Sequence, residues 1–289
     1  MDGDDVARAA RRIRRRLHKA MDEAAFRPRT VRGATYHRSI RVPSEDVSFA
    51  ARRFPRRNAD GGAAVVDGPD FVLVHGIGVS SRSYGPTAAE LAKHGTVHLI
   101  DLPGYGASPR PGHDIGIAEH AAAVAWYLRE QRLEQPVVVG HSMGTQVVAQ
   151  LAADEPELVG RIVLIAPVIW PDARSFRRAV RLLAVDGLRE PPIVTLLAMN
   201  DYLFRAGIPY MIEQMPHLMG NRMEEVMAQV RVPTLVIGGD MDPIVPLEWA
   251  QQIADTVEHG RFESVRGPHV AMFTDAAHVA SLIAGFARE

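Results

Sequence analysis

The stretch VVVGHSMGTQVV, residues 137–148, places a serine where a buried strand is expected to end and a helix to begin. Three valines precede Gly140, and a run typical of a helix follows Gly144. Glycine carries no Cβ, so two glycines permit a bend too tight for other residues. We therefore expect Ser142 to stand clear of the carboxyl end of the strand, beside the N-terminus of the helix.

The serine between the two glycines has the setting of a nucleophile. A serine hydroxyl needs a neighbouring base, and the oxyanion formed after attack needs N–H donors. The segment Gly140–Gly144 matches the G-x-S-x-G elbow, with the strand before and the helix after that this motif requires. A chance match at a strand–helix turn is the alternative. His141 adjoins Ser142, but neighbouring side chains on such a bend point apart, so we do not expect it to be the base.

Composition narrows the classes of protein that remain. The 289 residues suit one large domain or a domain with an insert, and the net charge of −1 offers no general attraction to nucleic acid. The chain has no cysteine, which excludes disulfides, Cys-ligated metals and a cysteine nucleophile. No apolar run is long enough to span a membrane, and the start lacks the apolar core of a secretory signal. We expect a cytoplasmic protein.

Residues 1–29 are predicted to form a basic helical arm. Apolar residues recur at steps of three or four over residues 5–26, and seven arginines and lysines surround them. Such an arm binds a membrane surface or an acidic partner, or it docks on its own domain. We favour docking, because the apolar stripe is rich in alanine and contains no Trp or Phe before Phe26.

Strand-like and helix-like runs alternate along most of the chain. Apolar runs that predict strands lie at Phe71–Val74, Val97–Ile100, Val137–Val139, Ile162–Ile165, Thr234–Ile237 and Phe262–Val265. Helical patterns predict helices at Ala88–Lys93, 117–132, Thr145–Ala153 and 276–287. This alternation is typical of a mostly parallel sheet with helices on both faces. We assign residues 30–167 and 230–289 to this α/β core, and 168–229, too long for a crossover, to an inserted helical cap.

A second stretch, FVLVHGIGVSS at residues 71–81, resembles the strand and His-Gly turn of the α/β-hydrolase superfamily, in its esterase, lipase and C–C-hydrolase group. The resemblance runs from about Phe71 to the end of the chain, and residues 1–45 lie outside it. It implies an α/β-hydrolase fold with an oxyanion hole formed by the N–H groups of Ile77 and Met143. It also implies that His75 is a hydrogen-bonded scaffold residue.

The same stretch permits a dinucleotide-binding interpretation. Gly76 and Gly78 follow a predicted strand, and Asp101 ends the next one. However, Ser81 stands where the third glycine belongs, and Asp101 opens DLPGYGAS (101–108), which is similar to a turn of the hydrolase family. The hydrolase interpretation is therefore preferred, and no cofactor is expected.

The hydrolase resemblance also implies an acid. TLVIGGDMDPIVP (234–246) resembles the family turn that carries it, with Asp242 at the acid position. Asp240 is the near alternative, and Asp172, after the preceding strand, is a further one.

The base is expected in RGPHVAMFTD (266–275), where His269 matches the family histidine. The family more often has Gly-His, whereas Pro268 intervenes here, which puts the geometry of the loop in doubt. His278 is expected on the surface. The histidines show no metal-binding spacing, so no metal is predicted.

The predicted cap would cover the serine. Six methionines crowd it: Met199, Met211, Met215, Met219, Met223 and Met227. We expect most of them to pack the cap onto the core, Met199 to contact substrate, and Pro216 and Gly220 to interrupt the run. Tyr84 and Trp170 follow predicted strand ends and are further candidates for substrate contact.

The sequence thus predicts a serine hydrolase that cleaves a small or medium apolar carboxylic ester, with Ser142 as nucleophile, His269 as base and Asp242 as orienting acid. One alternative is hydrolysis of a C–C bond in a ring-cleavage product, although that subgroup often has Asn where His141 stands. The other is a hydrolase-like receptor that binds a ligand without turnover. The expected partner is a small molecule, and the oligomeric state is left open.

Overall fold

The computed structural model describes residues 35–42, 47–56, 68–175, 177–178, 181–182, 185 and 207–289. The predicted arm over residues 1–29, the candidate Met199 and the middle of the predicted cap, residues 186–206, lie outside the described residues.

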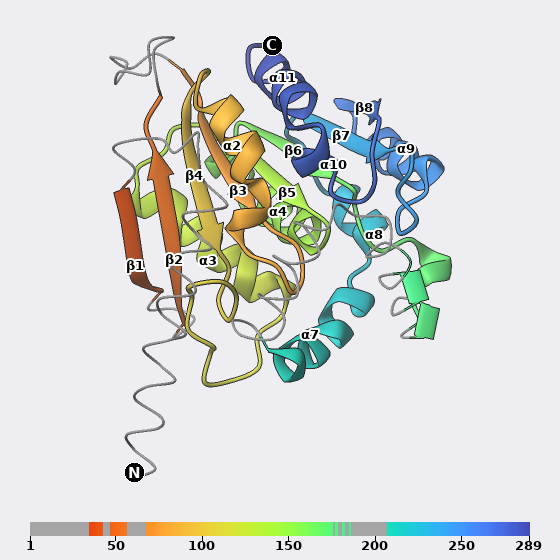
Figure 1. Cartoon of the computed structure of the whole chain (residues 1–289), viewed down its shortest axis with the longest axis horizontal. Coiled ribbons are helices and arrows are strands. Elements are labelled where there is room, and N and C mark those ends of the chain that lie inside the picture. The colour runs from red at the N-terminus through yellow and green to blue at the C-terminus, as the bar shows by residue number, and fades with distance from the viewer. Residues whose placement is uncertain are drawn as a thin grey trace.

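Eight strands of the described chain form one sheet in the order β1-β2-β4-β3-β5-β6-β7-β8 (Figure 1). They are β1 (Thr35–Val42), β2 (Val47–Phe54), β3 (Asp70–Val74), β4 (Thr96–Asp101), β5 (Val137–His141), β6 (Arg161–Ile165), β7 (Thr234–Gly239) and β8 (Gly260–Val265). The pairs β1–β2 and β2–β4 are antiparallel, and all the others are parallel. The predicted mostly parallel sheet is confirmed, with an antiparallel pair of strands at one edge.

Side chains of the parallel strands alternate between two apolar clusters, one on each face of the sheet. On β3, Phe71 and Leu73 enter one cluster, whereas Val72 and Val74 enter the other. Both faces are therefore covered, and a strand covered on both sides needs apolar residues at every position. This is why these strands appear in the sequence as continuous apolar runs.

Helices cover both faces of the sheet (Figure 1). One face carries α2 (Gly85–Leu91), α10 (Ala271–Thr274) and α11 (Ala276–Phe286). The other carries α3 (Ile117–Glu130), α4 (Met143–Asp154), α8 (Met223–Met227) and α9 (Leu247–Asp255). Helix α7 (Ile208–Gly220) lies beyond the carboxyl ends of the strands (Figure 1). Short 3-10 turns are η1 (Ser81–Tyr84), η2 (Pro156–Leu158) and η3 (Pro171–Ala173). The helices predicted near residues 88, 117, 145 and 276 correspond to α2, α3, α4 and α11.

The described end of the predicted cap consists of α7 and α8. Contrary to expectation, Pro216 does not interrupt α7, which continues through it to Gly220. Proline lacks the N–H that would bond to the carbonyl of Ile212. Both residues lie on the exposed side of the helix, where water can satisfy that carbonyl. Asn221 has an extended backbone and separates α7 from α8, so the interruption expected at Gly220 is present.

The methionines of the predicted cap that the structure describes serve mainly as packing. Met223 and Met227 of α8 are fully buried in the apolar cluster that also contains α4. The Thr145 hydroxyl lies 3.8 Å from the sulfur of Met223. These contacts attach α8 to the helix that begins beside Ser142.

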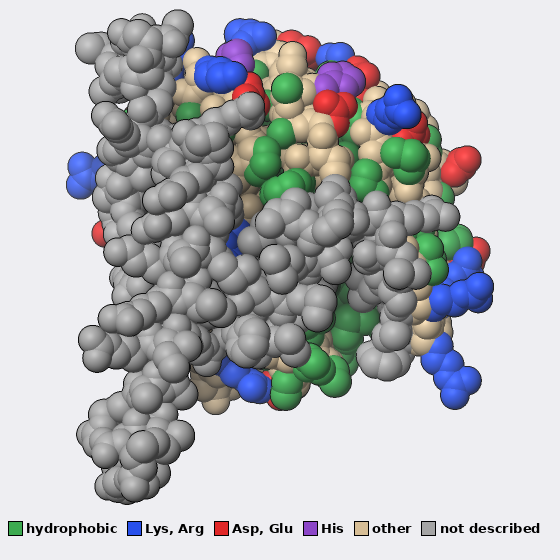
Figure 2. Space-filling view, viewed as in Figure 1, with side chains coloured by type: hydrophobic (Ala, Val, Ile, Leu, Met, Phe, Trp, Pro, Cys, Tyr) green, Lys and Arg blue, Asp and Glu red, His purple; other side chains and the backbone are tan. Residues whose placement is uncertain are grey.

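The surface of the described chain carries no marked charge segregation on the face shown in Figure 2, where basic and acidic side chains are interspersed. Within the described ranges, no helix combines the length and the apolar character that crossing a membrane requires.

His120 on α3 connects the core to α7. It is fully buried, and its Nε2 lies 3.2 Å from Oε1 of Gln214, whose Nε2 donates to the carbonyl of Ile115 at 3.0 Å. The amide oxygen accepts, so Nε2 of His120 carries the proton and the ring is neutral. Burial lowers the pKa of His120 from 6.5 to about 4.

This shift makes stability depend on pH. The unfolded chain binds a proton at His120 near pH 6.5 and the folded chain only near pH 4, so stability is lost as pH falls through that window. The full shift corresponds to about 3 kcal/mol. We predict that His120→Gln, which cannot titrate, loses less stability than the wild type between pH 7 and pH 4.5 in urea unfolding. The exposed His113, replaced by Gln, is the control and should behave as wild type; equal pH dependence in all three proteins would contradict the prediction.

Candidate active site

Ser142 occupies a strained bend between β5 and α4. Its φ of 54° and ψ of −123° lie where residues other than glycine rarely occur. Its N–H donates to the carbonyl of Ile165 at 3.0 Å, and its carbonyl accepts from the Thr145 hydroxyl at 2.6 Å. Such a conformation persists only when the surroundings hold it on several sides, and strain of this kind is typical of functional sites.

Glycines make room for this bend. A Cβ on Gly140 would overlap the carbonyl of Gly144, and a Cβ on Gly144 would overlap the carbonyl of Val74 at the end of β3. A Cβ on Gly76 would stand 2.9 Å from that of Ser142. The ends of β3 and β5 and the start of α4 therefore meet at a separation that only glycine allows.

His269 and Asp242 lie in contact. Nδ1 of His269 is 2.8 Å from Oδ2 of Asp242, and both side chains are buried. The other carboxylate oxygen, Oδ1, accepts from the N–H groups of Ile244 at 2.7 Å and Val245 at 3.1 Å. A carboxylate only accepts, so Nδ1 of His269 carries the proton and Nε2 keeps its lone pair. This is the tautomer that can remove a proton from a hydroxyl.

The alternative acids lie elsewhere. Asp240 is exposed, and its Oδ1 accepts from the N–H of Gly267 at 2.9 Å, in the loop between β8 and α10 that carries His269. Asp172 is exposed in η3. Asp240 therefore holds the loop, whereas Asp242 holds the imidazole. His278 is exposed, and its Nδ1 lies 3.3 Å from Oδ2 of Asp275, the residue just before α11.

The loop with His269 reaches the strand that precedes Ser142. Nε2 of His141 lies 3.0 Å from the backbone carbonyl of His269, and the two ring centroids are 4.9 Å apart. Because β5, β7 and β8 are parallel, their carboxyl ends share one edge of the sheet, where the predicted nucleophile, acid and base all lie.

The predicted oxyanion donors flank the serine. Met143 is the first residue of α4, so its N–H has no partner one turn earlier in the helix. His75 donates from Nδ1 to the carbonyl of Gly76 at 2.8 Å, and its Nε2 accepts from the N–H of Leu102 at 3.0 Å. In a trans peptide the carbonyl and the next N–H point in opposite directions, so this bond directs the N–H of Ile77 away from His75. Burial lowers the pKa of His75, which keeps Nε2 free to accept.

A small apolar cavity of about 30 Å³ opens at Ser142. The described residues that line it are Ile77, Ser142, Val168, Ile169, Leu182, Met215, Leu218 and Ile244. All of them except Ser142 are apolar, so the wall suits an uncharged group. By the ≳10–15 Å³ that one water needs, the space holds about two waters.

Only part of this wall was predicted from the sequence. Tyr84 is fully buried, its hydroxyl donates to the carbonyl of Val74 at 3.3 Å, and it is not among the described lining residues. Trp170 is half-buried under the guanidinium of Arg178, 4.7 Å from its ring, and is not among them either. Val168, Ile169 and Ile244 were missed, although their places just after β6 and just after Asp242 could have revealed them.

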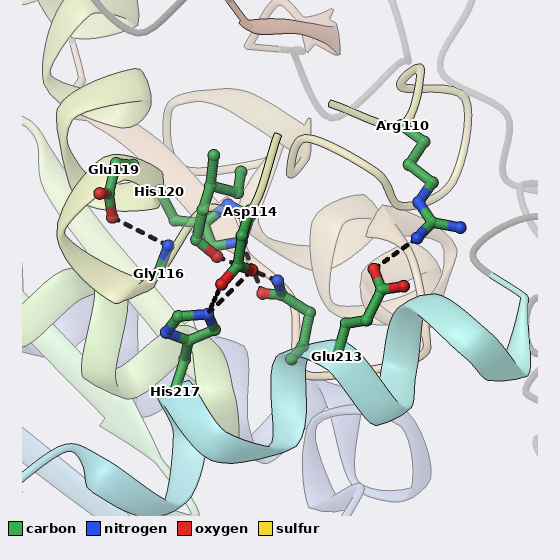
Figure 3. Close-up of polar contacts among 9 residues, drawn as sticks. Arg110, Asp114, Gly116, Glu119, His120, Glu213 and His217 are labelled. Carbon is green, nitrogen blue, oxygen red and sulfur yellow. Dashed lines mark hydrogen bonds and ion pairs between the residues drawn. The ribbon is translucent and has the colours of Figure 1, made fainter. Parts of the chain in front are cut away.

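Polar contacts hold α7, which supplies Met215 and Leu218 to the cavity, against the core (Figure 3). Glu213 pairs with Arg110, and His217 lies 2.9 Å from Asp114. On the buried side, Gln214 bonds to Ile115 and His120, as described above. These contacts fix one wall of the cavity to the loop before α3.

No three His, Asp or Glu side chains gather into a possible metal site anywhere in the part of the chain that the structure describes.

Residues 69–229 match the sequence profile described as the alpha/beta hydrolase fold. The chain belongs to this family. The family assignment, predicted from the elbow and the His-Gly turn, is thereby confirmed, and with it the hydrolytic nature of the protein.

Relatives with named activities match about two thirds of the chain or more. The chain is 27% identical over 242 residues to a pyrrolizixenacetamide deacetylase of Xenorhabdus hominickii, covering 76% of this chain and 91% of the relative. It is 27% identical over 216 residues to a pimeloyl-[acyl-carrier protein] methyl ester esterase of Chromobacterium violaceum, covering 66% of this chain and 82% of the relative. A crystal structure of a hydrolase from Pseudomonas aeruginosa superposes with a TM-score of 0.70 at 19% identity, covering 88% of this chain and 98% of that one, and shows the shared fold.

Asp242 and Asp240, the two acids that follow β7, are expected to differ in how much activity is lost when each is replaced. Asp242→Asn would reverse the hydrogen bond to Nδ1 and favour the wrong tautomer of His269, so we predict a loss of about 10⁴ in kcat for p-nitrophenyl acetate. Asp240→Asn keeps an oxygen that can accept from Gly267 and should lose less than about tenfold, the scale of one uncharged hydrogen bond. Steady-state kinetics on both purified variants provide the measurement, and a larger loss in the Asp240 variant would exchange the two roles.

Proposed function

We propose that the protein is a serine hydrolase that cleaves small or medium apolar carboxylic esters through an acyl-enzyme on Ser142. The observation that carries the proposal is the buried contact between His269 and Asp242, at the same sheet edge where strained Ser142 opens into an apolar cavity. The named activities of the relatives, a deacetylase and a methyl ester esterase, support acyl transfer to water.

In the proposed first half-reaction, Oγ of Ser142 attacks the ester carbonyl carbon while Nε2 of His269 accepts its proton. Asp242 stabilises the imidazolium that forms. The N–H groups of Ile77 and Met143 bind the oxyanion, and each such donor typically contributes about 3 kcal/mol to the transition state. His269 then passes the proton to the alcohol oxygen as the C–O bond breaks, which leaves the acyl group on Ser142.

In the second half-reaction, water attacks the acyl carbon and His269 accepts one of its protons. Collapse of the tetrahedral intermediate returns that proton to Ser142 and releases the carboxylic acid. The free enzyme is restored with no cofactor consumed.

The lining and size of the cavity favour a substrate with a short, uncharged acyl group. None of its described lining residues carries a charge, so an acyl group with a second carboxylate would lose its hydration without a partner. The apolar wall instead favours alkyl groups, at about 0.8 kcal/mol for each buried methylene that fits.

The first test concerns the nucleophile. Ser142→Ala is expected to lower kcat for p-nitrophenyl acetate by about 10⁶, as in comparable triads. A fluorophosphonate probe should label the wild type and not this variant, whereas Ser83→Ala, in the neighbouring turn η1, should remain labelled and active. Turnover that survives in Ser142→Ala would refute the acyl-enzyme. Tight ester binding by the wild type without turnover would favour the receptor alternative, and cleavage of dienoate ketones but not esters would favour C–C hydrolysis.

The second test concerns the cavity wall. We predict that Leu218→Ala raises kcat/KM for p-nitrophenyl octanoate relative to the acetate by about tenfold, because the space gained accommodates roughly two more methylenes. Ile212→Ala is the matched control, since Ile212 lies on the exposed side of the same helix and should leave the chain-length profile unchanged. A wild-type profile in Leu218→Ala would show that α7 does not limit the acyl group.

A further inference from the structure

His141, the last residue of β5, lies beside the nucleophile but has no part in the proton transfers proposed above. Its side chain is buried, and Nε2 lies 3.0 Å from the backbone carbonyl of His269. A carbonyl oxygen only accepts, so Nε2 carries the proton and donates. The bond joins residues 128 positions apart in the chain.

Nε2 provides the hydrogen bond of the His141 ring, because the other ring nitrogen, Nδ1, is buried and has no hydrogen-bond partner among the described residues. A buried acceptor without a partner is unfavourable by about 1–3 kcal/mol, so packing alone would favour an apolar side chain here. The donor at Nε2 distinguishes histidine from an apolar residue of similar size.

The loop that carries His269 is held at two places. Asp240 accepts from the N–H of Gly267, and the carbonyl of Gly267 accepts from the N–H of Met241 at 3.0 Å. Gly267 has a φ of +151°, a backbone conformation that residues with a side chain rarely adopt. Two residues later, His141 binds the carbonyl of His269 itself, which fixes the backbone from which the imidazole projects.

His141 also contacts the imidazole directly. The two rings lie 4.9 Å apart between centroids and are inclined by 53°. The titratable groups that face His141 are His269, His75 and Tyr84, whose ring centroid is 6.5 Å away. Burial, with His269 and His75 nearby, lowers the pKa of His141 well below its usual value. A neutral neighbour leaves His269 free to become charged when it accepts a proton.

We propose that His141 is a positioning residue that sets the catalytic base against the nucleophile, by donating Nε2–H to the backbone carbonyl of His269 from the position next to Ser142. The inference rests on the function proposed above. On this proposal β5, which ends next to Ser142, also fixes the distance between Ser142 and His269.

Three substitutions separate the donor from the bulk of the ring. His141→Gln retains an N–H donor at about the position of Nε2, His141→Phe retains the volume without a donor, and His141→Asn retains a donor that is too short to reach. We expect His141→Phe and His141→Asn to lose about 10–100-fold in kcat for p-nitrophenyl acetate, with KM nearly unchanged, since a displacement of about 1 Å in a catalytic group has this effect. His141→Gln should recover most of the loss.

Hydrogen–deuterium exchange tests the same inference without relying on turnover. The peptide that contains residues 266–271 should exchange faster in His141→Phe and His141→Asn than in the wild type, and at nearly the wild-type rate in His141→Gln. If the Phe variant does not fold, the comparison of Asn with Gln gives the same information. Unchanged exchange of this peptide in the Asn variant would overturn the inference, as would equal kcat in the Asn and Gln variants.

The two proposals fail in distinguishable ways. If wild-type turnover does not depend on Ser142, the proposed function fails, and exchange of the loop still decides whether His141 positions it. If turnover depends on Ser142 but neither kcat nor exchange responds to residue 141, only the positioning role fails.

Discussion

The close approach of three backbone segments around Ser142 is the constraint on which the rest of the site depends. Gly76, Gly140 and Gly144 lie where the ends of β3 and β5 and the start of α4 meet, and a Cβ on any of them would collide with a neighbour. This proximity brings the His-Gly turn to the serine and leaves the start of α4 facing it. The strain at Ser142 is tolerated because strand β6 and the first turn of α4 bond its backbone from both sides.

Neutral buried histidines stabilise the surroundings of this bend. His75, His120 and His141 each use one ring nitrogen as a donor to an oxygen, and burial lowers the pKa of all three. A neutral imidazole can be locked in one tautomer by a single acceptor, so it serves as a directional link that brings no buried charge. Burial of these neutral rings also makes the fold sensitive to acid, because adding a second proton would place a charge on a buried imidazole.

Local patterns in the sequence predicted the sheet and the elbow, because each of these is encoded by a few neighbouring residues, and the turns with Asp242 and His269 were predicted from the resemblance to the hydrolase family. Contacts between distant segments could not be predicted in this way. The bond from His141 to the carbonyl of His269 leaves no trace in either stretch alone, and the same holds for the place of Leu218 of α7 in the cavity wall. The expectation for Pro216 was wrong because the rule that proline breaks helices ignores which side of the helix faces water.

The site therefore has two sides of different character. On one side, Asp242, His141 and the glycines hold the proposed reacting groups through buried contacts that tolerate little change. On the other side, α7 supplies part of the cavity wall, and two of its links to the core, Glu213 to Arg110 and His217 to Asp114, are largely exposed to solvent. Exposed ion pairs contribute little stability, typically under about 1 kcal/mol. The proposed chemistry is thus set by the buried side. We propose that the choice of acyl group depends on the wall that α7 supplies, which is held mainly by the buried hydrogen bonds of Gln214 rather than by the exposed pairs.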